Sequence, residues 1–255
     1  MVKLGNLTIS KIDKVTFGYE KLILDRLKLF DFAKSAIGEY CLSKADQLKG
    51  YDFQNFKGRF QTIKFRADRE IKSIKYDQMV NIGNGFIESE LSDAIFVLNI
   101  ANFEQWILEI LKIMIMQNPD MFEGDKKIDL SMIRESVDLD NLWERIVERY
   151  LIGLPYDGMK KMIERVVKIF EINKSVITTD HIGKINEYSQ CRNLIVHNHK
   201  IVNEAYVRKS GKFARYKQGD SISINEKILF DEGDALLRFM QDIRNYLGKK
   251  VKKNP

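Results

Sequence analysis

One short segment of the chain holds side chains of the kinds that transfer protons and bind phosphate. Arg192, Asn193 and His197 lie within six residues of one another. On a helix, Arg192 and His197 are about 140° apart around the axis, so only bending of the long arginine side chain would bring them together. Asn193 and His197 share a face, and the Asn193 amide could therefore orient the imidazole and select its tautomer. The alternative is an arginine and a histidine that merely cap the carbonyls of a helix end.

The surrounding sequence predicts a helix over residues 181–198. Apolar side chains recur on one face at intervals of three and four: Ile182, Ile185, Tyr188, Cys191 and Ile195. Another face carries amides and an imidazole instead of lysine and glutamate: Asn186, Gln190, Asn193 and His197. Uncharged hydrogen-bonding groups in a row suit a cleft or a symmetric interface better than open solvent. His199 lies about 200° around the helix from His197 and is at most an auxiliary group.

The string RNLIVHN, from Arg192 to Asn198, resembles the R-x4-6-H motif of the HEPN superfamily, in which a polar residue commonly comes after the arginine. The continuation HKIVNEAYV is also similar to the segment after the motif in many members. The expected order of elements fits as well: a long apolar helix carrying Phe103-Glu104, a middle helix pair, and the motif near a carboxyl-terminal helix. The resemblance covers residues 82–255 and implies a HEPN-like helical bundle.

This resemblance implies a metal-independent endoribonuclease that needs no cofactor. RNA carries its own nucleophile, the 2′-hydroxyl, so cleavage requires proton transfer and a cation for the charge on the phosphorane. We assign proton transfer to His197, phosphate binding to Arg192 and orientation of the imidazole to Asn193. The products would carry 2′,3′-cyclic phosphate and 5′-hydroxyl ends. Proteins of this type typically form homodimers with a composite cleft, and as toxins or antiviral effectors they require an antitoxin or another regulatory partner.

Glu104 is a further candidate for the catalytic site. The polar residues of the apolar segment around it form one narrow stripe, made of Asn99, Asn102, Gln105, Glu109 and Lys112. Glu104 lies outside that stripe among apolar neighbours, so its carboxylate needs a partner on the core side. Arg192 is the most economical partner, because the pair would direct the guanidinium toward the cleft. A different helix packing that brings Lys112 to Glu104 is the alternative.

The segment after the motif mixes cations with aromatic side chains. We expect these cations to bind the RNA backbone: Lys200, Arg208, Lys209, Lys212, Arg215 and Lys217. Tyr206, Phe213 and Tyr216 lie between them, and aromatic faces stack on the splayed bases of single-stranded RNA. Turn signals at Ser210-Gly211 and near Gly219 predict a small β-hairpin over residues 206–224. An exposed hairpin that its lysines keep soluble is the alternative interpretation.

The rest of the sequence predicts a mainly all-α protein. Periodicity and breakers predict helices over these ranges: 19–48, 53–79, 87–117, 131–151, 155–170, 181–198 and 231–248. Residues 1–18 show no helical period and are expected to form a short strand or an arm. Residues 1–80 are therefore interpreted as a mostly helical extension of unknown role, which precedes the HEPN-like domain at 82–255.

Composition limits the remaining function classes. The formal net charge of +6 divides into +6 for residues 1–80, −7 for 81–180 and +7 for 181–255, which suggests a polyanionic partner or ordinary lysine-rich solubility. Two cysteines and no zinc-type spacing favour a reducing, cytoplasmic setting. The polar amino terminus is not a secretory signal, and Glu104, Glu109 and Lys112 argue against a membrane span, so no membrane partner is expected.

Two other functions compete with the ribonuclease. A non-catalytic HEPN-type protein could bind RNA or nucleotides or scaffold a partner, although a scaffold has no evident need for both Arg192 and His197. A DNA-binding regulator is supported by charge alone, because the sequence has no identifiable helix-turn-helix or zinc motif.

Overall fold

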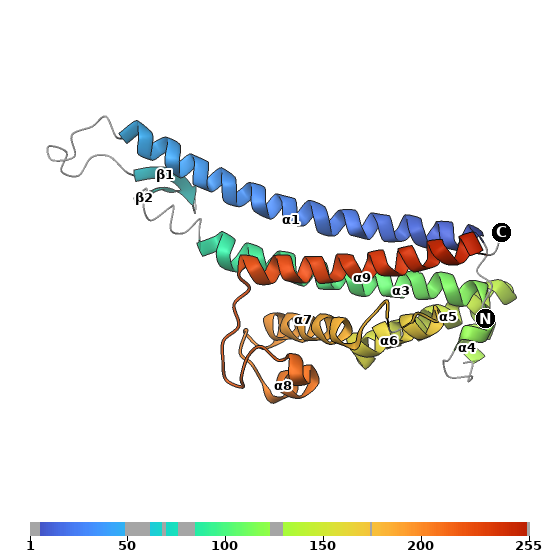
Figure 1. The fold of residues 1–255 in the computed structure, drawn as a ribbon. Coiled ribbons are helices and arrows are strands. Elements are labelled where there is room, and N and C mark those ends of the chain that lie inside the picture. The colour runs from blue at the N-terminus through green and yellow to red at the C-terminus, as the bar shows by residue number, and fades with distance from the viewer. Residues whose placement is uncertain are drawn as a thin grey trace.

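Three long helices form the frame of the protein in a computed structural model (Figure 1). The structure describes residues 6–48, 62–67, 70–75, 85–122, 130–173 and 175–253. The long helices are α1 (Asn6–Leu48), α3 (Ser92–Gln117) and α9 (Glu226–Lys253). Three shorter helices lie beside α3: α5 (Leu139–Asp157), α6 (Met159–Ile169) and α7 (Thr179–His197). Two more lie farther out: α4 (Leu130–Glu135) contacts α5, and α8 (Glu204–Ser210) contacts α7. The predicted all-α class is confirmed.

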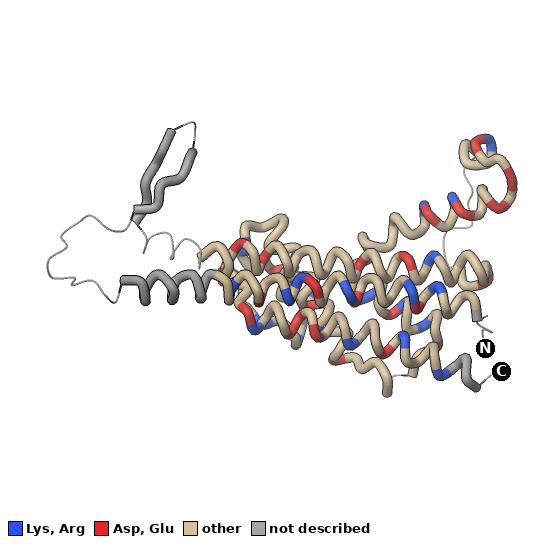
Figure 2. Tube along the Cα trace, turned by 90° about the horizontal axis from the view of Figure 1, so that it is seen from above, with Lys and Arg blue, Asp and Glu red and all other residues tan. Residues whose placement is uncertain are grey.

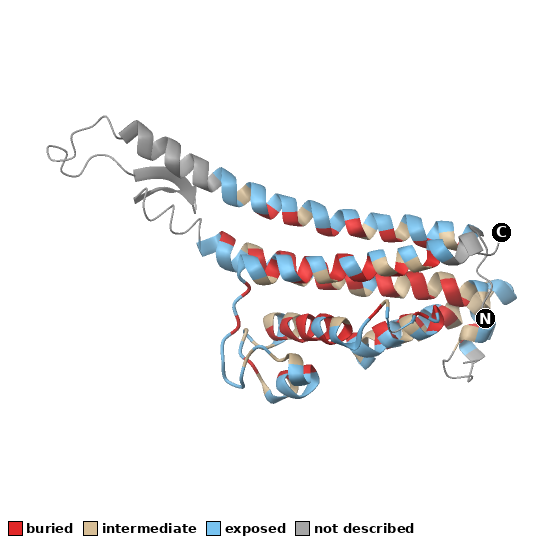
Figure 3. Cartoon of the chain, viewed as in Figure 1, coloured by how far each residue is buried: buried red, intermediate tan, exposed pale blue. Residues whose placement is uncertain are grey.

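The central element is α3, which contacts α1 and α9 as well as α5, α6 and α7. It comes directly after a π-helical turn at Phe86–Leu91, and it ends at Asn118-Pro119, as predicted from the proline. Thirteen of its 26 residues are buried, and they recur at intervals of three and four along the helix (Figure 3). The helical stretch Phe86–Gln117 is long and apolar enough to cross a membrane, and half of its most apolar window is buried inside the protein.

Helix α1 shares one hydrophobic core with α3 and α9. Ile12, Ile23 and Phe30 of α1 are fully buried in that core. The hydrophobic core therefore contains residues from both sides of the predicted domain boundary, which separates residues 1–80 from residues 82–255. The prediction of a strand or arm over residues 1–18 was wrong in its described part, because α1 begins at Asn6 and residues 1–5 lie outside the described ranges. Its early residues alternate polar and apolar side chains irregularly, and burial against α3 selects the helix.

Part of the polar stripe of α3 lies against α1 and α9: Asn99 and Glu109 bond to these helices, whereas Gln105 is exposed and Lys112 pairs with α5. The Trp106 indole donates to the Thr16 hydroxyl at 3.1 Å, and Tyr19 donates to a Glu109 carboxylate oxygen at 2.7 Å. The amide of Asn99, which is fully buried, donates to Glu232 of α9 at 3.1 Å. Polar groups that share one stripe thus satisfy one another across a helix seam.

The predicted helix over residues 53–79 was wrong in its described part. Strands β1 (Thr62–Ala67) and β2 (Glu70–Lys75) pair antiparallel, with Ile63 opposite Ile74. The string TIKFRA alternates polar and apolar residues, with Ile63, Phe65 and Ala67 on one face, which is the period of a strand. The other residues of that predicted helix lie outside the described ranges.

The predicted hairpin over residues 206–224 was also wrong. Helix α8 and a 3-10 turn at Gly211–Phe213 occupy its first half, and only Ile201 and Ser221 form an isolated β-bridge within this part of the described chain. The side chain of Asn203 accepts a hydrogen bond from the Tyr206 amide at 2.9 Å and so caps α8. This capping residue, together with Glu204 in the first turn, was the helix signal in the sequence.

The remaining boundaries depend on local capping. The helix predicted from Ser131 to Leu151 divides into α4 and α5, because the Asp138 side chain accepts from the Asn141 amide at 2.7 Å and starts a new helix. Pro155 lies inside the last turn of α5, and α6 begins after Gly158, which has a φ of +90°. Helices α7 and α9 confirm the predicted helices over 181–198 and 231–248.

Candidate functional site

Helix α7 carries the motif, and both of its ends are fixed by local contacts. Thr178 caps its first turn by accepting from the His181 amide at 3.2 Å. At the other end, His199 and Lys200 both have left-handed backbone conformations, with φ of 50° and 66°. The Lys200 amide donates to the Leu194 carbonyl, and the Lys200 carbonyl accepts from the Ile222 amide at 2.9 Å. The chain therefore turns away sharply, two residues after His197.

A hollow of about 380 Å³ lies between α7 and α8. It is lined by side chains of both helices and of the turn between them: Gln190, Asn193, Leu194, His197, Asn198, Asn203, Ala205, Tyr206 and Lys209. Three of the four members of the predicted amide stripe line it. The fourth, Asn186, donates from its amide to the Lys209 carbonyl at 2.9 Å and holds α8 against α7. The stripe therefore faces a cleft in the folded chain.

Arg192 does not line this hollow. Its guanidinium donates to the Asn193 side-chain oxygen at 3.1 Å, and Asn193 lines the hollow together with His197. His197 is exposed at the rim, whereas Arg192 is half-buried. The structure thus brings Asn193 and His197 together and connects Arg192 to them only through the Asn193 amide.

Glu104 and Arg192 are electrostatic neighbours across the contact between α3 and α7. Burial raises the pKa of the Glu104 carboxyl, and the positive charge of Arg192 partly opposes that rise. Lys112, the alternative partner, instead pairs with Glu144 at 2.9 Å and with Glu148 at 2.7 Å on α5. Glu104 and Arg192 therefore interact electrostatically, and no hydrogen bond or ion pair joins these two described residues.

The six cations predicted to bind RNA fall into two groups. Three of them pair with carboxylates: Lys200 with Asp93, Lys212 with Asp180 and Arg215 with Glu187. The other three, Arg208, Lys209 and Lys217, are exposed and have no carboxylate partner within the described ranges. Charges of both signs are interspersed along the helices (Figure 2). The cations available to a polyanion therefore lie on α8 and on the turn after it.

The buried Glu187 carboxylate is the centre of a hydrogen-bonded network that includes Tyr206, which lines the hollow. The Glu187 side chain is 3% exposed, and its carboxylate accepts from the Tyr206 hydroxyl, from the Cys191 thiol at 3.1 Å and from Arg215 Nη2 at 2.8 Å. The Arg215 guanidinium also lies over the Tyr188 ring, 4.9 Å from its centroid. Burial and the neighbouring carboxylate raise the pKa of the Cys191 thiol and of the Tyr206 hydroxyl.

Sequence reasoning missed Glu187. The available signal was its position four residues before Cys191 on a helix whose neighbouring residues Ile185 and Tyr188 are apolar. Arg215, which was predicted to bind RNA, also binds this buried carboxylate, 28 residues away in the chain.

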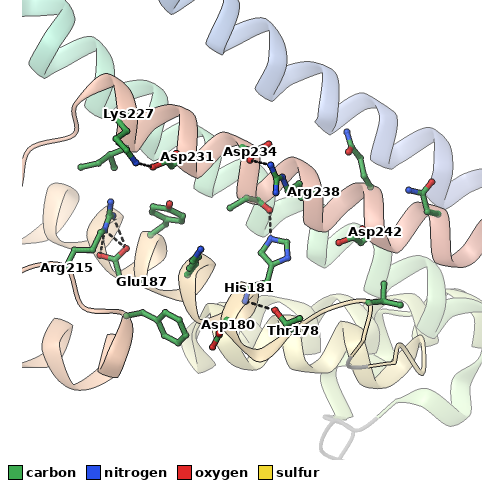
Figure 4. A pocket seen from close by; sticks show the side chains of 18 residues that line it. Thr178, Asp180, His181, Glu187, Arg215, Lys227, Asp231, Asp234, Arg238 and Asp242 are labelled. Atoms are coloured by element: carbon green, nitrogen blue, oxygen red, sulfur yellow. Dashed lines mark hydrogen bonds and ion pairs between the residues drawn. The ribbon is translucent and has the colours of Figure 1, made fainter.

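A larger cavity of about 830 Å³ lies on the other side of this network, between α7 and α9 (Figure 4). His181 points into it, and its Nε2 lies 2.8 Å from the Ala235 carbonyl oxygen. Because a carbonyl oxygen only accepts, Nε2 carries the proton. Glu187 and Arg215 line this cavity, and Tyr206, which donates to Glu187, lines the hollow beside His197. One network thus separates the two spaces.

Comparison of this chain with known proteins gives no further information on its function. A scan against protein-family models, a search of curated proteins and a search of solved structures find no match. Among the described residues, no group of three or more His, Cys, Asp or Glu side chains is placed to hold a metal ion.

Proposed function

We propose that this protein is a metal-independent endoribonuclease of HEPN type that cleaves single-stranded RNA. The observation that supports it is the arrangement at the end of α7. His197 lies exposed at the rim of a polar hollow, and the Asn193 amide beside it is hydrogen-bonded by Arg192 at 3.1 Å. Arg192 is thereby joined to Asn193, which lines the same hollow as His197, and the imidazole is open to a substrate.

The reaction uses the substrate's own 2′-hydroxyl. His197 accepts the proton of that hydroxyl, the oxygen attacks the adjacent phosphorus, and the bond to the 5′-oxygen breaks as that oxygen takes up a proton. The products carry 2′,3′-cyclic phosphate and 5′-hydroxyl ends. Arg192 carries the permanent positive charge that stabilises the phosphorane, and its bond to Asn193 places that charge next to the hollow. The exposed cations Arg208, Lys209 and Lys217 hold the flanking backbone.

A second copy of the chain supplies the second imidazole. One histidine does not serve easily as both base and acid in a single passage, and the exposed position of His197 leaves it open to a symmetry mate. We propose a cytoplasmic homodimer that acts as a toxin or antiviral effector and is restrained by an antitoxin or another regulatory partner.

One observation favours a non-catalytic alternative. Arg192 itself does not line the hollow, and its Nε is buried without a hydrogen-bond partner among the described residues. If the guanidinium serves only to position Asn193, the hollow would bind RNA or a nucleotide without cleaving it.

RNA cleavage by the purified protein in the presence of EDTA tests the proposal. His197→Ala and Arg192→Ala should each lower the cleavage rate at least about 100-fold, since each removes a proton-transfer or charge-stabilising group. His199→Asn, which preserves a left-handed backbone, is the matched control and should retain cleavage. Unchanged cleavage by both alanine variants would contradict the mechanism, as would a monomeric mass under assay conditions.

A further inference from the structure

The inner end of the hollow between α7 and α8 has the properties of a subsite for a nucleobase. Gln190 is 7% exposed and lines this end. None of the hydrogen bonds among the described residues engages its amide, and neither of its polar atoms is fully enclosed by protein. A buried amide that opens only to a cavity has a donor and an acceptor to offer to a ligand.

The other amides around the hollow are already partly engaged. Asn186 donates to the Lys209 carbonyl, and Asn198 donates to the Ile201 carbonyl. Asn203 uses its side-chain oxygen to cap α8, which leaves its amide nitrogen as a donor. Gln190 is therefore the side chain of this hollow that keeps a donor and an adjacent acceptor both available.

The depth of the hollow is graded along α7. Gln190 is buried, Asn193 is half-buried and His197 is exposed. Gln190 and His197 are seven residues apart on one face, which corresponds to about 10 Å along the helix axis. This is comparable to the span of one nucleotide from its phosphate to the far edge of its base. Leu194, Ala205 and the ring of Tyr206 add apolar surface between the two ends.

We propose that Gln190 determines specificity by pairing with an adenine base of the RNA whose phosphate lies at His197. A glutamine amide binds adenine with two hydrogen bonds: its oxygen accepts from the amino group, and its nitrogen donates to the neighbouring ring nitrogen. Sequence-specific recognition of single-stranded RNA commonly extrudes a base into such a pocket and reads its edge. A volume of about 380 Å³ accommodates one nucleotide. This inference rests on the proposed ribonuclease function.

Cleavage of an RNA library with randomised positions, followed by sequencing of the 5′-hydroxyl ends, tests the inference. The wild-type protein should prefer adenine at one position next to the cleaved bond by at least about fivefold. Gln190→Ala should reduce that preference to less than about twofold. Gln190→Glu should favour guanine over adenine, because a carboxylate accepts two hydrogen bonds from the N1–H and N2–H groups of guanine. Gln105→Ala, which changes an exposed glutamine of α3, is the matched control and should keep the adenine preference.

The outcomes separate this inference from the proposed function. A base preference that Gln190→Ala and Gln190→Glu both leave unchanged would overturn the role of Gln190 while the ribonuclease stands. A preference for another base would overturn the assignment of adenine. If the wild-type protein cleaves no RNA, the proposed function fails, and calorimetric titration with AMP decides about the subsite. Binding that is at least about fivefold weaker for Gln190→Ala would support the subsite, and equal binding would overturn it.

Discussion

Two buried glutamates, one on α7 and one on α9, differ in how many hydrogen-bond partners their carboxyl groups have. Glu187, on α7, has hydrogen-bond or ion-pair partners from Tyr206, Cys191 and Arg215. Glu232, on α9, is fully buried and bonded at one oxygen by Asn99, while its other oxygen has no partner among the described residues. Burial raises the pKa of the Glu232 carboxyl well above its ordinary value, against the smaller opposing effects of Asn99 and Arg26.

The difference identifies a source of pH-dependent stability. Glu187 has a full set of donors, which hold the groups around it in place. A buried carboxyl with one bonded oxygen has a raised pKa, and its ionisation works against the folded state. The seam between α1, α3 and α9 therefore contains a group whose ionisation lowers the free energy of unfolding.

Removing the cation of the satisfied network should have the largest effect on stability. Arg215→Ala leaves the buried Glu187 carboxylate without its cation, whose own side chain is 31% exposed, so we expect a loss of about 3 kcal/mol in the free energy of unfolding. Urea denaturation measures it. The matched control is Arg208→Ala, at an exposed position on α8, with an expected change within about 0.5 kcal/mol. Equal effects of the two variants would contradict the assigned role of the network.

The Tyr206 hydroxyl should contribute the next largest amount. Tyr206→Phe removes a donor to Glu187 and also the acceptor of the Arg215 amide, so a loss of about 2 kcal/mol is expected. Tyr216→Phe is the control, since that hydroxyl makes one exposed bond of 3.4 Å to the Ser223 carbonyl. The melting temperatures of the two variants should differ by several degrees. Identical melting temperatures would contradict the contribution assigned to the Tyr206 hydroxyl.

Glu232→Gln should stabilise the protein at neutral pH. In the folded chain the Glu232 carboxyl has a raised pKa, so the folded state holds its proton to higher pH than the unfolded state does. The free energy of unfolding therefore falls as pH rises above about 4.3, the ordinary glutamate pKa, until the folded group also ionises.

Glutamine at position 232 removes this dependence, and we expect a gain in the free energy of unfolding at pH 7 that disappears toward pH 4. Unfolding measured across that pH range, with the exposed Glu90→Gln as control, checks the prediction. A gain that does not vary with pH would show that the substitution acts through packing and not through the proton.

The smallest effect is expected at Gly183 of α7. An added Cβ would lie 2.0 Å from the Phe213 ring, so Gly183→Ala must displace that ring and should cost about 1 kcal/mol. Gly153→Ala in α5 meets open space and should instead gain about 0.5–1 kcal/mol, because alanine favours the helix. Chemical denaturation should show a lower free energy of unfolding for Gly183→Ala and a higher one for Gly153→Ala. A higher free energy of unfolding for both variants would mean that Phe213 moves freely.

Much of the frame could be predicted from the sequence because its helices are long and strongly periodic. The apolar run of α3 and the proline after Asn118 define the central helix without tertiary information. The short elements could not be assigned in this way. The mixture of cations and aromatics after Lys200 fits a strand or a helix equally well, and the capping side chain of Asn203 decides between them.

The candidate site was predictable where it depends on spacing within one helix. Asn193 and His197 share a face because they are four residues apart, and the structure places both at one hollow. The proximity of Glu104 to Arg192 could be inferred from the need of a buried carboxylate for a cation. The pairing of Glu187 with Arg215 could not be read in advance, because it depends on how the chain returns after α8.

That return path has a consequence for how the protein can change over evolutionary time. The backbone pairs Val202 with Asp220 and with Gly219, and Lys200 with Ile222, so the excursion that contains α8 starts and finishes at nearly the same point. Insertions within such a closed excursion cost little, since loop-closure entropy grows only slowly with length. Descendants of this chain could therefore reshape one wall of the hollow while the three-helix frame and the end of α7 remain as they are.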